Sequence, residues 1–235
     1  MELKILVIIP CYNEEASLPS LIKELRAIDT YQVSILAVND CSSDGTEAVL
    51  RANNVPTLDL PVNLGIGGAV QSGFIYACQN DFDIAIQVDG DGQHPPAELH
   101  KLLDHHFATG ANVVIGSRFI GSSSFRSTLA RRIGIRYLYL INRLLTGNSI
   151  YDSTSGFRLF DKQAITIAAA LYPDEYPEPE SLVLFSKHHL KIAEVAVNMR
   201  ERQGGISSIR NFGSFYYIVK VTIAMFYSLI RYTKK

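Results

Sequence analysis

Short apolar runs alternate with amphipathic stretches along the first half of the chain. The apolar runs predict strands at residues 5–9, 33–38, 57–60, 84–88 and 113–116. The stretches between them predict helices at residues 14–28, 44–53, 66–79 and 97–107. Strands that are apolar throughout are typical of a parallel sheet covered on both faces. The pattern therefore predicts an α/β fold with one open, mostly parallel sheet and helices on both faces.

Polar residues and glycines gather in the loops that follow the predicted strands. These loops are residues 10–14, 39–45, 63–68, 89–94 and 117–119. In open parallel sheets, ligands bind outside the carboxyl ends of the strands. We therefore expect one crevice to collect the side chains of these loops.

The turn Asp89-Gly90-Asp91 follows the fourth predicted strand and precedes a helix that begins at Pro96. Two carboxylates on one turn suit Mg²⁺ or Mn²⁺, which prefer oxygen ligands and keep positions for water and phosphate. Gln93 adds a neutral oxygen. A leaving diphosphate needs such a cation because it departs with extra negative charge. We predict a divalent-metal site at Asp89, Asp91 and Gln93; the alternative is a polar turn whose aspartates cap backbone groups.

Two further loops carry candidate nucleotide contacts. Asp40 can accept hydrogen bonds from a ribose hydroxyl or a base N–H, whereas Asp44 is expected to cap the following helix. The glycine-rich segment 65–68 departs from the G-x-G-x-x-G pattern, because Val70 stands at the third glycine position. It also follows the third strand, not the first. We interpret it as a loop of close approach beside a nucleotide and expect no NAD.

The charged residues are unevenly divided, although the whole chain carries a net charge of only −1. Residues 1–104 hold 15 Asp and Glu against 5 Lys and Arg, whereas residues 105–235 hold 8 against 17. No acidic residue lies between Asp104 and Asp152. This division indicates a cation site in the first part and an anionic partner for the second; chance asymmetry on solvated faces is the alternative.

Two stretches in the second half are amphipathic. Residues 125–145 interleave five arginines with aliphatic residues, as is typical of a helix that binds anionic lipid headgroups. An ordinary surface helix is the alternative. Residues 212–232 are rich in aromatics, and their longest uncharged run, 221–230, is shorter than the roughly 20 residues that cross a bilayer. This stretch is expected to lie in a membrane interface or to dock on a membrane-protein partner.

Six segments together resemble glycosyltransferase family 2, in its dolichol- and polyprenyl-phosphate sugar synthase branch. They are Ile8-Ile9-Pro10-Cys11-Tyr12-Asn13-Glu14-Glu15, Asn39-Asp40-Cys41-Ser42-Ser43-Asp44-Gly45-Thr46, Asn63-Leu64-Gly65, Asp89-Gly90-Asp91-Gly92-Gln93-His94-Pro95, Gly116-Ser117-Arg118-Phe119 and Thr154-Ser155-Gly156-Phe157-Arg158. Each segment alone is moderately specific for this family, whereas the occurrence of all six segments in this order is highly specific. The resemblance implies a GT-A catalytic domain at residues 1–210, followed by an aromatic and basic amphipathic helix at 211–235.

The resemblance also implies roles for individual residues. The nucleotide-sugar pocket would be lined by Pro10, Tyr12, Glu14, Asp40, Gly65, Asp89 and Gly90. Asp89, Asp91 and Gln93 would hold the metal on the diphosphate. The catalytic set would be Asp91, Arg118, Arg131 and Arg202. In that set Arg118 and Arg131 would face the acceptor phosphate, and Arg202 would close a glycine-containing loop over the donor to exclude water.

The segment Tyr176-Pro177-Glu178-Pro179-Glu180 lies where relatives that glycosylate hydroxyls place an acidic base region. A hydroxyl acceptor needs a base to take its proton, whereas a phosphate acceptor is already ionised and needs positive charge. Glu178 and Glu180 are therefore expected first to contact the donor sugar or to have a structural role. A catalytic base is the alternative.

The expected activity is inverting transfer of a hexose or N-acetylhexosamine from a UDP- or GDP-sugar to polyprenyl phosphate, with Mg²⁺ or Mn²⁺. The alternatives are transfer to a saccharide hydroxyl and a catalytically silent subunit that binds a nucleotide-sugar. The sequence shows no signal-peptide pattern, and its three cysteines have no disulfide or metal spacing. We expect a peripheral protein on the cytoplasmic side of the membrane, with a small membrane-protein partner or a homo-oligomer and without nucleic acid.

Overall fold

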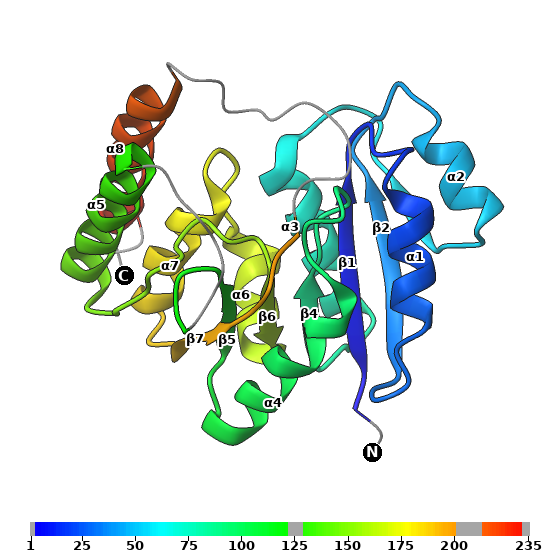
Figure 1. Cartoon of the computed structure of the whole chain (residues 1–235), viewed down its shortest axis with the longest axis horizontal. Coiled ribbons are helices and arrows are strands. Elements are labelled where there is room, and N and C mark those ends of the chain that lie inside the picture. Colours follow the sequence, from blue (N-terminus) through cyan, green and yellow to red (C-terminus); the bar gives the residue numbers. More distant parts are fainter. Residues whose placement is uncertain (1–2, 122–128, 201–212, 232–235) are drawn as a thin grey trace.

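The centre of the molecule is a seven-stranded sheet with the strand order β3-β2-β1-β4-β6-β5-β7 (Figure 1). The computed structural model describes residues 3–121, 129–200 and 213–231, without the side chains of 129–133, 213–215 and 217. The strands are β1 (Ile5–Cys11), β2 (Val33–Asn39), β3 (Thr57–Asp59), β4 (Ile84–Gln87), β5 (Val113–Ser117), β6 (Arg158–Asp161) and β7 (Ile192–Ala196). Only β6 runs antiparallel to its neighbours β4 and β5 among the described pairs. The predicted α/β fold with a mostly parallel sheet is confirmed.

Helices connect these strands. They are α1 (Leu18–Arg26), α2 (Thr46–Ala52), α3 (Gly65–Gln79), α4 (Leu99–Thr109), α5 (Leu129–Thr146), α6 (Lys162–Leu171), α7 (Pro177–Lys187) and α8 (Gly213–Arg231). A short 3₁₀ turn, η1 (Pro96–Glu98), leads into α4 and begins at the proline that marks a helix start. The apolar pattern located the elements up to β5 but did not predict β6, α6, α7 and β7. Strand β6 opens with a buried arginine, so its hydropathy gives little signal.

Both faces of the sheet are covered, as predicted. Side chains alternate along β1, so Ile5, Val7 and Ile9 pack with buried residues of α1, α2 and α4. Leu6 and Ile8 point to the other face, where buried residues of α3, α6 and α7 cover them. The strands are apolar at consecutive positions because each face of the sheet belongs to its own core cluster.

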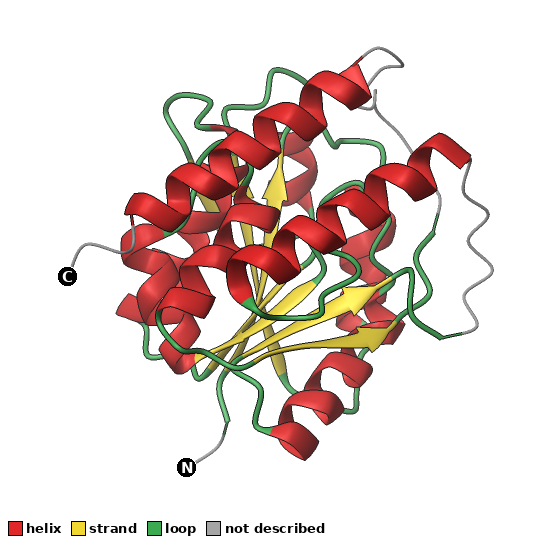
Figure 2. Cartoon of the chain, turned by 90° about the vertical axis from the view of Figure 1, so that its left-hand side faces the viewer, coloured by secondary structure: helices red, strands yellow, loops and turns green. Residues whose placement is uncertain are grey.

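A further layer lies outside α7. Helices α5 and α8 run side by side there, at the left in Figure 1 and facing the viewer in Figure 2. Leu138 of α5, Val183 of α7, and Val221 and Met225 of α8 form a small core of their own. The two predicted amphipathic helices therefore exist, and both pack on α7. No helix in the described ranges is both long and apolar enough to cross a bilayer.

Helix α3 lies unusually close to β1. A Cβ atom at Gly73 would collide with the side chain of Ile8, which is fully buried beneath it. A Cβ atom at Gly67 would likewise collide with the carbonyl oxygens of Pro173 and Asp174. The glycines in and after the segment 65–68 thus let backbone elements approach each other, and Gly67 serves the loop before α7 rather than a ligand.

Gly73→Ala is expected to destabilise the fold by about 1–3 kcal/mol, because the added methyl group overpacks a core with no room to yield. Urea unfolding of the two proteins measures the difference. Gln79→Ala, on an exposed position of the same helix, is the control and should change stability by less than about 0.5 kcal/mol. Equal stability of Gly73→Ala and wild type would show that the helix can move away from the strand.

Candidate functional site

A cleft of about 750 Å³ opens at the carboxyl ends of β1, β2 and β4. Its described lining consists of Pro10, Cys11, Tyr12, Asn13, Glu14, Asp40, Asn63, Gly65, Ile66, Ala69, Asp89, Gly90 and Asp91. The volume lies within the range of small-molecule sites, about 300–1,000 Å³. Seven of the nine residues predicted to bind the nucleotide-sugar therefore line one cavity, together with Asp91, whereas Glu178 and Glu180 are absent from its described lining.

The loops after β1 and β2 are locked together at the rim of this cleft. The Asn13 N–H donates to Ser42 Oγ at 3.1 Å, and Asn13 Oδ1 accepts from the Ser43 N–H at 2.8 Å. The Glu14 N–H donates to Thr46 Oγ1 at 2.9 Å. Asn13 has a φ of 57°, in the left-handed region that asparagine tolerates better than most residues. The two loops thus form one preformed wall.

Asp40 joins that wall to helix α3. Its two carboxylate oxygens accept the N–H groups of Leu64 and Gly65 at 2.7 and 2.9 Å, at the start of α3. The predicted contact of Asp40 with a ribose or base remains a prediction, since each oxygen keeps a second lone pair. Asp44 Oδ1 accepts the N–H of Thr46 in the first turn of α2, in agreement with its expected capping role.

The turn Asp89-Gly90-Asp91 is packed against the end of β1. The Gly90 N–H donates to the Pro10 carbonyl at 3.3 Å, and the Gly90 carbonyl accepts from Ser17 Oγ at 2.7 Å. Ser17 Oγ also lies 3.0 Å from a carboxylate oxygen of Glu14. A Cβ at position 90 would stand 3.1 Å from the Pro10 oxygen, so glycine suits this close approach.

The two carboxylates of the turn are held differently. Asp89 Oδ1 accepts from Gln87 Nε2 at 3.0 Å, and the Asp89 N–H donates to His94 Nδ1 at 3.0 Å. Asp91 Oδ1 accepts the Gln93 N–H at 3.0 Å. Gln93 is not among the described lining residues of the cleft, and its N–H closes the turn. The metal role predicted for Gln93 stays a prediction.

The lining has a strongly one-sided charge. Glu14, Asp40, Asp89 and Asp91 contribute four carboxylates, and no Lys or Arg occurs among the described lining residues. No group of three His, Cys, Asp or Glu in the described part of the chain could by itself hold a metal ion. Two carboxylates facing a cleft suit a cation that takes its remaining ligands from phosphate and water. The residues present therefore fit a divalent metal shared with an anionic ligand.

Arg118 follows β5 and forms a bidentate ion pair. Its Nε and Nη2 atoms donate to the two oxygens of Asp152 at 2.8 and 2.7 Å, and Nη2 also donates to Thr154 Oγ1 at 3.1 Å. Behind this pair, the carboxylate of Glu194 on β7 accepts the N–H groups of Tyr151 and Asp152, both at 2.7 Å. Burial raises the pKa of Glu194, while these two N–H groups oppose the shift. The guanidinium of Arg118 is thus fixed in direction by a chain of carboxylates.

Arg158, at the start of β6, is fully buried and ties three segments together. It donates to the carbonyl oxygens of Ser153, Ser155 and Glu178 at 2.7–2.8 Å and to Ser181 Oγ at 2.9 Å. Burial lowers the pKa of Arg158. The loop before β6 and the first turn of α7 are therefore held in place around one guanidinium.

Glu178 and Glu180 lie in different surroundings although both belong to the first turn of α7. Burial raises the pKa of Glu178 to about 7; Arg158 opposes the shift, and Asp89 adds to it. Glu178 therefore lies within electrostatic reach of the turn Asp89-Gly90-Asp91. Glu180 instead accepts from Ser228 Oγ of α8 at 2.7 Å and from the Tyr176 N–H at 3.2 Å. These contacts fasten α7 to α8, and Glu180 is absent from the described lining of the cleft.

Two predicted catalytic residues cannot be placed. Arg202 lies outside the described residues, and the side chain of Arg131 on α5 is not described. Four further residues were not predicted to have site roles: Gln87, Asp152, Arg158 and Glu194. Gln87 lies within a predicted apolar strand, and a polar residue at such a position was the available signal for it.

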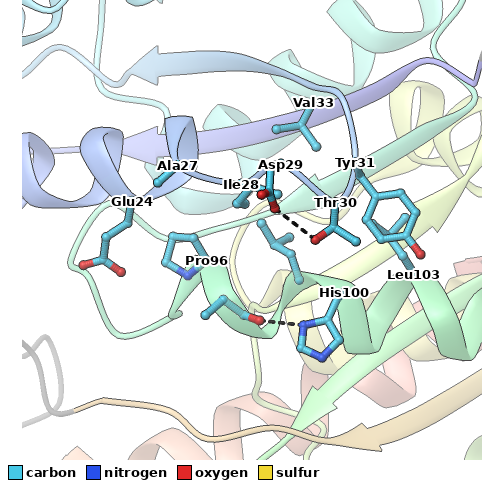
Figure 3. A pocket seen from close by; sticks show the side chains of 12 residues that line it. Glu24, Ala27, Ile28, Asp29, Thr30, Tyr31, Val33, Pro96, His100 and Leu103 are labelled. Carbon is cyan, nitrogen blue, oxygen red and sulfur yellow. Dashed lines mark hydrogen bonds between the residues drawn. The ribbon is translucent and has the colours of Figure 1, made fainter.

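A second hollow, of about 400 Å³, lies between the end of α1 and the start of α4 (Figure 3). Glu24, Tyr31, Pro96 and His100 are among its lining residues. His100 Nδ1 faces the Ala97 carbonyl at 2.7 Å. None of the predicted site residues is among the residues that line this hollow.

Comparison with solved structures agrees with the fold. Glucosyl-3-phosphoglycerate synthase from Mycobacterium tuberculosis, in complex with Mn²⁺, UDP and glucosyl-3-phosphoglycerate, superposes with a TM-score of 0.70 at 20% identity. The match covers 97% of this chain and 79% of that one. At this identity the likeness shows the shared GT-A fold.

Sequence relatives cover most of the chain. The uncharacterized protein MJ1222 of Methanocaldococcus jannaschii is 32% identical over 83% of this chain and 80% of its own length. A UDP-N-acetylglucosamine–dolichyl-phosphate N-acetylglucosaminyltransferase from Methanococcus voltae is 30% identical over 82% of this chain and 84% of its own length. The polyprenol monophosphomannose synthase of Mycolicibacterium smegmatis is 29% identical over 87% of this chain and 80% of its own length.

The sequence profile of Glycosyl transferase family 2 matches residues 6–166. That range runs from β1 to α6 and contains every described residue that lines the acidic cleft. This chain is a glycosyltransferase and belongs to glycosyl transferase family 2.

Proposed function

We propose that this protein transfers a hexose or N-acetylhexosamine, with inversion, from a UDP- or GDP-sugar to polyprenyl phosphate, with Mg²⁺ or Mn²⁺. The observation that carries the proposal is the single acidic cleft in which the predicted donor residues meet. Two relatives are named for dolichyl phosphate and for polyprenol monophosphomannose, and these names favour a lipid phosphate as the acceptor.

The donor would bind with its nucleoside between the first and second loops of the cleft. Tyr12 and Ile66 line the cleft and keep 51% and 41% of their surface exposed, so they offer apolar area to a base. The diphosphate would lie at Asp89 and Asp91. A metal ion there would neutralise the charge that the leaving nucleoside diphosphate gains. The protein contributes position: the turn is already fixed on β1 before a ligand arrives.

The acceptor would approach from the side of Arg118, with Arg131 and Arg202 as further partners of its phosphate. An oxygen of that phosphate attacks the anomeric carbon, while the bond from this carbon to the diphosphate oxygen breaks on the opposite face. No proton has to be removed, because the phosphate is already ionised. A guanidinium held in direction by Asp152 can bind phosphate without reorganising, which lowers the cost of the transition state.

The direct test is incubation of the protein with labelled UDP- and GDP-sugars, Mn²⁺ and undecaprenyl phosphate. We expect label to become extractable into organic solvent, and Asp91→Ala to lower the rate by at least about 100-fold, since it removes a contact to the leaving group. EDTA should have the same effect. Absence of lipid-linked label with every donor, also in the presence of membranes from the source cell, would contradict the lipid acceptor.

Arg118→Lys sharpens that test. Lysine keeps the charge but cannot form the bidentate pair with Asp152, so the cation loses its fixed direction. We expect the KM for polyprenyl phosphate to rise by about tenfold or more, with the affinity for the nucleotide-sugar unchanged. Steady-state kinetics with each substrate varied in turn measures both quantities. A rise in the KM of the donor alone would assign Arg118 to the other substrate.

A saccharide hydroxyl acceptor is the second candidate, and the raised pKa of Glu178 favours it. A carboxyl group with a pKa of about 7 is poised to take a proton near neutral pH. Glu178→Gln separates the two functions. It should lower transfer to a hydroxyl by about 100- to 10,000-fold, but transfer to a phosphate by far less, because a phosphate needs no base.

The same variant tests the pKa itself. Because burial raises the folded-state pKa of Glu178 from 4.5 to about 7, its proton stabilises the fold. That contribution is complete below pH 4.5 and is lost as the pH rises through about 7. Thermal unfolding of Glu178→Gln, which stays neutral, should match wild type in acid and exceed it above neutrality. A constant difference at all pH values would show that Glu178 does not titrate in this range.

We infer that the outer face of α5 and α8 rests on the membrane surface. Leu144 and Ile230 are 74% and 66% exposed. Further exposed apolar residues on these helices are Tyr137, Leu140, Tyr216, Val219, Ile223, Phe226 and Tyr227. Positions 223, 227 and 230 recur at helical spacing and share one side of α8. Arg136, Arg143 and Lys220 are exposed on the same two helices and suit anionic headgroups.

Ile223→Asp combined with Ile230→Asp should lower binding to vesicles of phosphatidylglycerol and phosphatidylcholine by about tenfold or more, because two apolar contacts are replaced by charges. Vesicle flotation measures this. Ile75→Asp, an equally apolar change at a 40% exposed position on α3, is the matched control and should bind as wild type does. Unchanged flotation of the double variant, with a dimer in solution, would instead assign this face to a second copy of the chain.

A further inference from the structure

Gln87 is the last residue of β4 and is completely buried. Its Nε2 atom donates to Asp89 Oδ1 at 3.0 Å. The acceptor is a carboxylate, so the amide must present its nitrogen there and its oxygen on the other side. That oxygen, Oε1, has no hydrogen-bond partner among the described residues. Leaving a buried amide oxygen unpaired is costly, so the fold gains little from glutamine at this position.

Asp89 is confined on its other sides as well. A Cβ at Gly156 would lie 2.9 and 3.1 Å from its two carboxylate oxygens and 2.8 Å from Gln87 Nε2. His94 Nδ1 accepts the Asp89 N–H, so the neutral ring carries its hydrogen on Nε2, 3.7 Å from Asp89 Oδ2. The His94 ring is stacked on Phe157 with 5.0 Å between centroids. The carboxylate therefore has its direction fixed by Gln87, Gly156 and His94.

We propose that Gln87 is a positioning residue: its amide N–H holds the Asp89 carboxylate in the orientation that receives the divalent cation. This rests on the metal site of the proposed function and adds a residue to it. Groups that orient a metal-ligating side chain typically contribute about 10- to 100-fold to metal affinity. The unpaired Oε1 is then the stability cost of placing a donor directly behind the metal ligand.

The test uses Gln87→Met in the full-length protein. Methionine has nearly the same shape but no amide, so Asp89 loses its buried donor while the core stays filled. The probe is Mn²⁺ itself, titrated with UDP present and followed by the electron paramagnetic resonance of the free ion. We expect the affinity for Mn²⁺ to fall by about tenfold or more. The Tm without metal should stay within about 4 °C of wild type, because removing the unpaired oxygen offsets the lost hydrogen bond.

Asn142→Leu is the matched control. Asn142 on α5 is also fully buried, and its Nδ2 atom is also unpaired among the described residues, but it is remote in sequence from the Asp89 turn and absent from the cleft lining. This change should leave the affinity for Mn²⁺ as in wild type. Gly156→Ala would crowd both Gln87 Nε2 and the Asp89 carboxylate and should weaken Mn²⁺ binding as Gln87→Met does.

The possible results distinguish the positioning role of Gln87 from the existence of the metal site. Wild-type affinity in Gln87→Met overturns the positioning role and leaves the metal site standing. A large loss of Tm in parallel with the loss of affinity assigns Gln87 a structural role and also overturns the proposal. Failure of wild type to bind Mn²⁺ with UDP removes the metal site of the proposed function, and the role of Gln87 with it.

Discussion

Four carboxylates face a cleft whose described lining contains no cationic side chain, and this charge imbalance governs the rest of the site. Like charges at such short range repel, and burial from water strengthens the repulsion. Backbone N–H groups relieve it in part: Asp40 accepts two of them and Asp91 one. In the proposed reaction, the remaining imbalance would require an anionic diphosphate to enter together with a cation.

Two arginines of the second part of the chain are also held by their surroundings. Arg118 is bound by Asp152, whose own position depends on Glu194, and Arg158 is surrounded by carbonyl oxygens. Each guanidinium thus has its direction set by partners that are absent from the described lining of the cleft. Acidic residues of the first part of the chain line the cleft, whereas these two arginines lie outside its described lining.

The sequence predicted that the loops lining the cleft would meet, because these loops follow strands. The carboxyl ends of parallel strands meet at one edge, so residues 10–14, 39–45 and 89–91 had to converge once the sheet was recognised. The surroundings of Arg118 and Arg158 could not be predicted in this way. Strand β6 enters the sheet antiparallel between β4 and β5, and its buried Arg158 has no apolar pattern. Pairs such as Asp152 and Glu194, which are 42 residues apart, have no local signal at all.

Glu178 and Glu180 are a second case in which the sequence could not predict the surroundings of a residue, here within one helical turn. Residues two positions apart on a helix point about 200° away from each other, so the same motif serves two neighbours. Glu180 reaches Ser228 and fastens α8 to α7, whereas the pKa of Glu178 is raised by burial and is influenced by the charges of Arg158, Asp89 and Arg118. The two residues are of the same type, so the sequence does not reveal this difference. The packing of α7 between the sheet and α8 decides which of the two side chains faces α8.

That packing also links the two substrates of the proposed reaction. Val183 of α7 belongs to the core shared with α5 and α8, while the Glu178 carbonyl in the first turn of the same helix accepts from Arg158. Helix α7 thus connects the layer of α5 and α8 with the segments that Arg158 holds together. A lipid phosphate held at the membrane surface would then meet the donor without a large movement of the sheet. Rigid-body packing of this kind supplies the orientation on which an in-line displacement depends.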